Sequence, residues 1–215
     1  MLNPINYFWR IFLMKKFLVA LILAVFAPAL IAQSNGNGIK VFGGKMSERG
    51  ETRILFWDGN ENAPVGEFVI AYGLPKWKAE YAESGTFDKM TKGRVWRLGK
   101  NFWTVLDTNL PLRVGGEQIE PGSYYLGVMR STDGKKWELC FIDPASAREK
   151  RLDASQIGMA EIALKAPLRF SGDQPTQETL TMTLEKAEKK LNRATLKITW
   201  GTFLLQTPVV AHLPN

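Results

Sequence analysis

Strict alternation of apolar and polar residues is the feature that most limits how this chain can fold. In the segment 195–200, Leu196, Ile198 and Trp200 alternate with polar residues, so all three lie on one face of an extended strand. The segment 179–184 repeats the pattern, with threonine at every second position. Strands with one apolar and one polar face are typical of antiparallel sheets. The alternation therefore predicts an all-β, antiparallel protein.

Turn residues separate the strand-like runs at short intervals. A Gly-Gly pair stands at 115–116, a Pro-Gly pair at 121–122 and an Asp-Gly pair at 133–134. Such pairs favour the backbone conformations of tight hairpins. With further strand candidates at 53–57 and 67–72, we count roughly nine strands. This spacing favours a single-domain antiparallel β-sandwich over residues 39–215.

Helix is scarce in this chain. The segment 145–151 can hold two turns, because Pro144 suits the first position of a helix. The charged segment 185–192 lies between two strand patterns, and we expect it to form the end of a hairpin. We expect residues 33–38 to form a flexible lead-in to the domain.

The first 32 residues have the order of a secretory signal peptide. Lys15 and Lys16 precede an apolar run over residues 17–32, and polar sequence begins at Gln33. The run of about 16 residues is shorter than the roughly 20 that a membrane-spanning helix needs. We predict cleavage after Ala32, which would leave no membrane span, and a periplasmic or extracellular location. An uncleaved anchor is the alternative.

The start of translation affects how much of this segment is leader. Residues 1–13 resemble additional sequence before a start at Met14, because the charged and apolar regions of the leader follow that methionine directly.

The charge balance of the mature chain argues against nucleic acid as a partner. Three of the 28 basic residues lie in the predicted leader, which leaves 25 basic against 21 acidic residues, a net charge of +4. A small excess that is spread along the chain indicates a solvated surface and not a nucleic-acid footprint.

No catalytic motif is visible in the sequence. Cys140 is the only cysteine and lies in a strand-like run, so we expect a buried, inert thiol and no disulfide. His212 is the only histidine and lies near the C-terminus, where we expect it to end a strand. We therefore predict no metal and no cofactor. A hydrolase could use two carboxylates from separate strands, and the available acids are Asp58, Glu61, Asp107, Glu117, Glu120 and Asp143.

The stretch KGRVWRLGKNFWT at 92–104 is unusually rich in tryptophan, arginine and glycine. Alternation places Trp96 and Leu98 on the core face and Arg97 on the other face. The guanidinium of Arg97 suits a carboxylate or phosphate, and the Asn101 amide offers both a donor and an acceptor. We predict that these two residues line a ligand pocket near Tyr72. The alternative is that Arg97 holds a loop through backbone carbonyls.

The six tryptophans of the mature chain can fill a core or stack on sugars. Trp137 and Trp200 alternate with apolar neighbours, so we expect them in the core. Trp57, Trp77 and Trp103 stand beside polar or loop residues and are the better surface candidates.

An ordered set of motifs resembles a known bacterial family. The stretch 93–104 is similar to the signature VWR-x-G-x-N-x-x-T of domain-of-unknown-function family 2911. The other matching positions are Tyr72, Pro75, Gly115, Gly116, Pro121, Gly122, Tyr124, Trp137, Trp200 and Gly201. The resemblance spans about residues 65–212 and implies a secreted, β-rich domain, without implying an activity or a cofactor.

Two positions depart from the family pattern. Phe102 stands where the family usually has Glu, and Leu74 stands where it usually has Arg before the upstream proline. Any ligand contact made by those Glu and Arg side chains is therefore changed or lost in this chain.

These observations lead to one function and two alternatives. We expect a non-catalytic exported protein that binds a small molecule, a glycan or an envelope partner. The alternatives are an extracytoplasmic hydrolase and a purely structural envelope protein. Convergent carboxylates in a cleft would favour the hydrolase, and a flat, exposed row of tryptophans would favour glycan binding.

Overall fold

The chain divides into two units, one up to Met46 and one from Ser47 onward. The computed structural model describes residues 33–34, 38–44 and 46–214, and the predicted signal peptide lies outside these residues. In the first unit, β1 (Gln33–Ser34) pairs antiparallel with β2 (Lys40–Val41).

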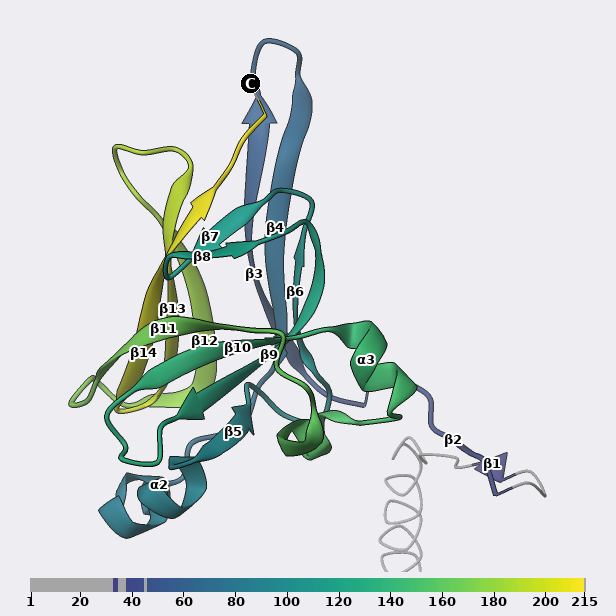
Figure 1. Ribbon diagram of the computed structural model, residues 1–215, viewed down its shortest axis with the longest axis vertical. Coiled ribbons are helices and arrows are strands. Elements are labelled where there is room, and N and C mark those ends of the chain that lie inside the picture. The colour runs from purple at the N-terminus through teal and green to yellow at the C-terminus, as the bar shows by residue number, and fades with distance from the viewer. Residues whose placement is uncertain (1–32, 35–37, 45, 215) are drawn as a thin grey trace, which may run out of the picture. The chain divides into compact units, whose positions relative to one another are not determined.

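The second unit is built on one antiparallel sheet of twelve strands (Figure 1). In chain order they are β3 (Arg49–Asp58), β4 (Ala63–Gly73), β5 (Arg94–Arg97), β6 (Thr104–Thr108), β7 (Leu112–Val114), β8 (Glu117–Ile119), β9 (Gly122–Arg130), β10 (Trp137–Ile142), β11 (Leu164–Ser171), β12 (Gln177–Lys186), β13 (Arg193–Gly201) and β14 (Phe203–Ala211). The helical segments are η1 (Ala79–Ala82), α2 (Ser84–Thr91), α3 (Pro144–Glu149) and η2 (Ala154–Met159). The predicted all-β, antiparallel class is confirmed, as is the short helix near residues 145–151.

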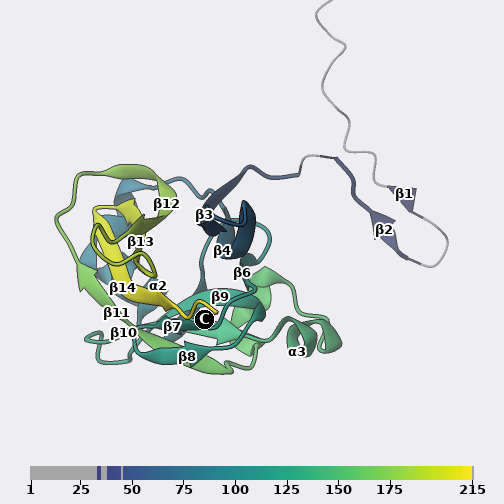
Figure 2. The same ribbon diagram turned by 90° about the horizontal axis from the view of Figure 1, so that it is seen from above.

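The strands follow the order β12-β13-β14-β11-β10-β9-β6-β4-β3, with β5 paired to β9 and β7 paired to both β14 and β8. The sheet curls until its two ends, β3 and β12, lie beside each other, so that it is nearly closed like a barrel (Figure 2). The predicted sandwich of roughly nine strands in two sheets is not confirmed, because all twelve strands belong to one sheet. Local alternation defines the faces of a strand, but it does not define which strands pair.

Side chains of β3 and of the neighbouring strand β4 bond to β12 across the seam. The Tyr72 hydroxyl donates to the Met182 carbonyl at 3.3 Å and accepts from the Met182 amide at 3.0 Å. The Leu184 amide donates to Thr52 Oγ1 at 3.0 Å. These bonds satisfy backbone groups of β12 that a neighbouring strand would otherwise satisfy.

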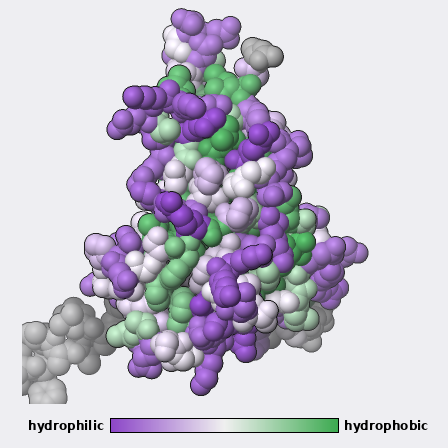
Figure 3. All heavy atoms as spheres, turned by 60° about the vertical axis from the view of Figure 1, so that its left-hand side comes forward, coloured by the Kyte–Doolittle hydropathy of each residue, from purple (hydrophilic) through white to green (hydrophobic). Residues whose placement is uncertain are grey.

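The main core fills the inside of the curled sheet. Leu180 and Met182 of β12 and Leu196 and Ile198 of β13 are buried on this inner face, as the alternation predicted. Hydrophilic residues predominate on the face shown in Figure 3, with apolar residues in smaller patches between them. The polar positions that alternate with the buried residues of β12 and β13 are half-buried or exposed.

The centre of β9 and β10 departs from the expected pattern, because it is buried on both faces. Cys140 and Ile142 of β10 are buried on the outer face of the sheet. A second apolar cluster forms there, in which Ala147 of α3 and Ile157 of η2 pack against Tyr125 and Ile142. Asp143 begins α3 by accepting hydrogen bonds from two backbone amides of its first turn.

Two hairpin predictions are also confirmed. The Gly-Gly pair at 115–116 is the two-residue turn between β7 and β8, and both glycines have positive φ, 60° and 101°. The charged segment 185–192 includes the end of β12 and the turn that leads to β13.

Candidate functional site

The structure does not bring the three predicted ligand residues to one place. Tyr72 lies in the inner core with 4% of its surface exposed, and both hydrogen bonds of its hydroxyl go to Met182. Arg97 ends β5 on the same strand face as Val95, which packs in the outer cluster. Asn101 is exposed and has a left-handed φ of 66°. Tyr72 and Arg97 thus belong to opposite faces of the sheet. A ligand pocket lined by Tyr72, Arg97 and Asn101 stays a prediction.

Arg97 lies close enough to Asp153 to influence it electrostatically. The pKa of the Asp153 carboxyl is held below its usual range chiefly by hydrogen bonds from the Ser155 hydroxyl and amide, and the charge of Arg97 adds to the effect. Asp153 also caps η2 together with Gln156. This setting indicates a structural contact between β5 and η2.

The signature stretch connects two strands that pair consecutively with β9. Four residues of β9 from Gly127 pair with β5, and Leu126 begins the pairing with β6. Between these strands, the buried Thr104 hydroxyl donates to the Leu98 carbonyl. Gly99 has a φ of 121°, which L-residues rarely adopt, and a Cβ there would lie 2.9 Å from the Gly73 amide nitrogen. The stretch therefore forms a tightly packed turn of the fold.

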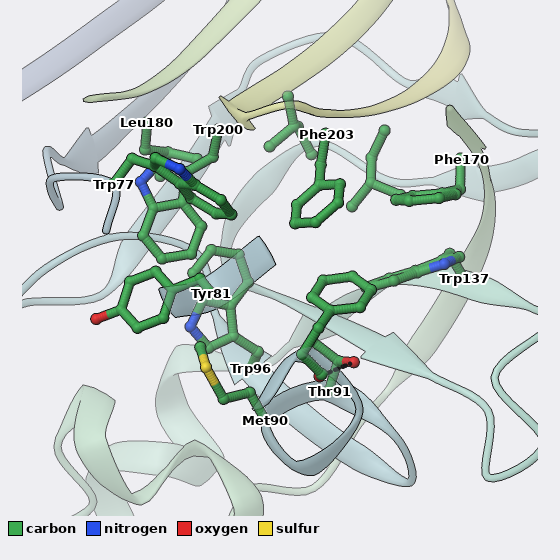
Figure 4. A pocket seen from close by; sticks show the side chains of 13 residues that line it. Trp77, Tyr81, Met90, Thr91, Trp96, Trp137, Phe170, Leu180, Trp200 and Phe203 are labelled. Atoms are coloured by element: carbon green, nitrogen blue, oxygen red, sulfur yellow. Dashed lines mark hydrogen bonds between the residues drawn. The ribbon is translucent and has the colours of Figure 1, made fainter. Parts of the chain in front are cut away.

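A pocket lined by aromatic residues lies at one end of the curled sheet, and we refer to it as the aromatic pocket (Figure 4). It encloses a cavity of about 50 Å³. Its rings belong to Trp77, Tyr81, Phe87, Trp96, Trp137, Phe170, Trp200 and Phe203, and Met90, Thr91, Leu180, Ile198 and Leu205 complete the lining. No acid or base is among these residues, so the pocket suits an apolar group.

Trp200 is at the centre of one half of this pocket. Its ring stacks on Trp96 with a centroid distance of 5.2 Å and meets Trp77 edge-on, also at 5.2 Å. Its indole Nε1 donates to the Pro75 carbonyl at 3.1 Å. In the other half, Phe87 lies 4.4 Å from Phe203. These contacts fix the ring orientations.

Gly201 makes the packing around Trp200 feasible. It is the first residue of the two-residue turn between β13 and β14, with a φ of 59°. The Trp77 ring lies directly against its Cα, where a Cβ would meet three ring atoms. A larger residue would therefore clash with Trp77 and strain the turn.

The segments η1 and α2 cover the pocket but bury little of themselves. No residue of η1 is buried, and Thr91 is the only buried residue of α2. Arg130 of β9 fastens α2 to the sheet through Asp88 at 2.7 Å and the Thr91 hydroxyl at 3.1 Å. Its guanidinium also lies 5.0 Å from the centroid of the Phe87 ring.

The charge on Asp88 supports this attachment. Hydrogen bonds from Lys92 and then from Arg130 hold the pKa of the Asp88 carboxyl below its usual range. The stabilisation that the charged Asp88 carboxylate gives through Arg130 and Lys92 is therefore present at neutral pH. It is lost as the pH falls through the lowered pKa of Asp88.

A broader surface groove of about 490 Å³ lies next to the aromatic pocket, and we refer to it as the basic groove. It shares Trp137 and Phe170 with the aromatic pocket. The rest of its lining is Arg130, Gly134, Lys135, Lys136, Glu138, Pro167, Leu168 and Arg169. Four of these residues are basic and one is acidic.

The remaining polar candidates have structural surroundings. Burial raises the pKa of the Cys140 thiol to about 11, so the thiol is neutral at physiological pH. His212 directly follows β14, and its amide donates to Pro111. Asp107 accepts from the Ser123 hydroxyl at 2.7 Å, and Asp143 caps α3. The described part of the chain contains no group of three or more His, Cys, Asp or Glu residues placed to hold a metal ion.

Sequence reasoning missed the aromatic pocket as a unit. The surface assignment of Trp57 agrees with its 53% exposure, and Trp137 is buried as expected. Trp77, which we expected at the surface, is half-buried in the pocket. Trp103 is also half-buried and stacks on Tyr125 with a centroid distance of 4.5 Å. The pocket rings come from segments spread between residues 77 and 203, so no local spacing connects them.

Comparison with known proteins agrees with the motif resemblance. A family model described as "Protein of unknown function (DUF2911)" matches residues 61–209. No curated protein matches the chain, and no solved structure matches it either. In the part of the chain that the structure describes, no helix combines the length and apolar character needed to cross a membrane. The matched region includes the signature turn, Gly73, Trp77 and Trp200, and the chain belongs to the domain-of-unknown-function family 2911.

Proposed function

We propose that this protein is an exported, non-catalytic binding protein whose aromatic pocket receives an apolar group of a small ligand. The observation that carries the proposal is the cavity of about 50 Å³ among eight aromatic rings. A second cavity, inside the sheet, is only about 10 Å³. Protein interiors are normally close-packed, so a void of this kind at the end of a core favours a binding role.

The energetics of the cavity support this proposal. Unpacked space in a core costs roughly 24 cal/mol per Å³, so about 50 Å³ corresponds to about 1 kcal/mol of lost packing. An apolar group that enters the cavity recovers dispersion contacts with the surrounding rings. Ligand binding at this place therefore stabilises the fold.

Access to the pocket follows from its weakly buried cover. Met90 of α2 lines the cavity with a flexible side chain, which can adopt other rotamers to admit a ring larger than the present void. No residue of η1 is buried, whereas α2 is held through Arg130 and Phe87, so η1 and the Met90 side chain are the parts of the cover that can move most readily.

The geometry favours a small ligand over the alternatives. The pocket rings face one another across a cavity and do not form the flat, exposed row that would favour a glycan. The lining of the aromatic pocket contains no carboxylate for a hydrolase.

Binding can be tested with a neutral aryl compound, 4-phenylbutanamide, by calorimetric titration of the mature protein. We expect saturable binding to the wild-type chain and at least tenfold weaker binding to Met90→Trp, because the larger ring fills the cavity. Trp57→Phe, at an exposed position outside the pocket, serves as the control and should bind normally. Absence of saturable binding to the wild type, or equal affinity for Met90→Trp, would refute a role for the pocket.

Export is supported by the charge and hydropathy order of the leader. When the full-length gene is expressed in a bacterium with an outer membrane, we expect the protein in the envelope or culture fraction, with Gln33 as its first residue. N-terminal sequencing of that fraction checks this. An intact N-terminus on a cytoplasmic product would contradict export.

A further inference from the structure

The basic groove adds a second recognition element directly beside the aromatic pocket. The two sites share Trp137 and Phe170, whose rings stack with a centroid distance of 5.4 Å. Phe170 is 37% exposed, so its ring reaches from the cavity to the surface. A ligand held in the aromatic pocket can therefore extend along these two rings into the groove.

Some charged side chains of the groove have an ionic partner and others do not. Arg130 is engaged by Asp88, and Glu138 lies 3.8 Å from Lys165. Lys135 and Lys136 form no ion pair with any residue that the structure describes. The charges of both lysines help to lower the pKa of the nearby Asp133 carboxyl, so the two lysines and this one carboxylate leave a smaller net positive charge at this rim of the pocket.

Arg169 adds a further positive charge to the lining of the groove, on the face of β11 opposite to Phe170. Its Nε lies 3.0 Å from the terminal amide of Gln206, with the amide oxygen as acceptor. This partner is uncharged, so it orients the guanidinium without neutralising it. A guanidinium held in this way presents its remaining donors to a carboxylate or a similar anion.

We infer that the ligand is an amphipathic organic anion, with its apolar body in the aromatic pocket and its anionic group in the basic groove. This inference rests on the proposed function and specifies the chemical class of the ligand. Lys135, Lys136 and Arg169 supply the attraction for the anion, and the stacked rings of Trp137 and Phe170 form the path between the two sites.

The experiment compares 4-phenylbutyrate with 4-phenylbutanamide, which differ in the charge of the terminal group. We expect the carboxylate to bind the mature protein at least tenfold more tightly at low ionic strength. Raising the salt to about 0.5 M should reduce this preference, because exposed charges are then screened within a few ångströms. Calorimetric titration gives both affinities under the same conditions.

A pair of double variants provides the matched control. In Lys135→Gln/Lys136→Gln, we expect the preference for the carboxylate to fall at least threefold, while amide binding stays unchanged. Lys189→Gln/Lys190→Gln removes the same charge from two consecutive lysines in the β12–β13 turn. This variant should keep the wild-type preference for the carboxylate. Equal affinity of the wild type for the two compounds overturns the anionic class, as does an equal loss in both double variants. Failure of both compounds to bind refutes the pocket itself, so the two proposals fail in distinguishable ways.

Discussion

Replacing Trp200 by alanine is expected to lower the free energy of unfolding by about 3–5 kcal/mol, the usual cost of truncating a packed tryptophan. The ring shares the inner face of β13 with two buried residues, Leu196 and Ile198. It lies within 5.3 Å of three other aromatic rings by centroid distance. The Pro75 carbonyl would also lose its indole partner. A loss of this size is a large part of the 5–15 kcal/mol that typically stabilises a domain.

Urea denaturation followed by circular dichroism measures this effect without depending on tryptophan fluorescence. Trp57→Ala is the matched control, because Trp57 is 53% exposed on the edge strand β3. It should cost less than about 1 kcal/mol, as is usual for surface substitutions. If Trp200→Ala also cost less than about 1 kcal/mol, the ring contacts would not stabilise the fold and the aromatic pocket would not be a packed unit.

The features that the sequence predicted correctly depend on local patterns. Alternation identified the inner faces of β12 and β13, because successive side chains of a strand point to opposite sides whatever the neighbouring strands are. Glycine pairs identified the tight turn at 115–116 for the same local reason. Burial of the run 139–142 on both faces was not predicted, although a continuous apolar run is a signal of it. The elements that cover its outer side, α3 and η2, come from later in the chain.

The features that the sequence did not predict depend on strand order. Tyr72 and Arg97 lie in strands whose positions in the sheet cannot be derived from spacing, so nothing in the sequence indicated that they belong to opposite faces. Closure into one sheet was not predicted for the same reason. It depends on contact between β3 and β12, which are more than a hundred residues apart in the sequence. The aromatic pocket results from this closure, because the closed sheet brings Trp77 against the turn after Trp200.

Gly73→Ala is expected to destabilise the protein by at least about 3 kcal/mol, at the upper end of what overpacking usually costs. Gly73 ends β4 where the signature turn crosses it, and the two backbones are in direct contact. A Cβ at this position would lie 2.5 Å from the amide nitrogen of Lys100 and 2.9 Å from its carbonyl carbon. A flexible side chain could rotate away from the added methyl group, but a backbone segment cannot do so without moving the whole turn.

The turn that would have to move is held from both sides, which is why we expect a large effect. The Thr104 hydroxyl donates to Leu98, and the Arg49 guanidinium donates to the Trp103 carbonyl at 2.9 Å. Gly172→Ala is the matched control, because a Cβ there meets no atom within 4 Å and the backbone conformation is open to alanine. Both variants can be compared by urea denaturation. If they had equal stability, the signature turn could adjust freely, and its glycines and asparagine would need an explanation in binding instead of packing.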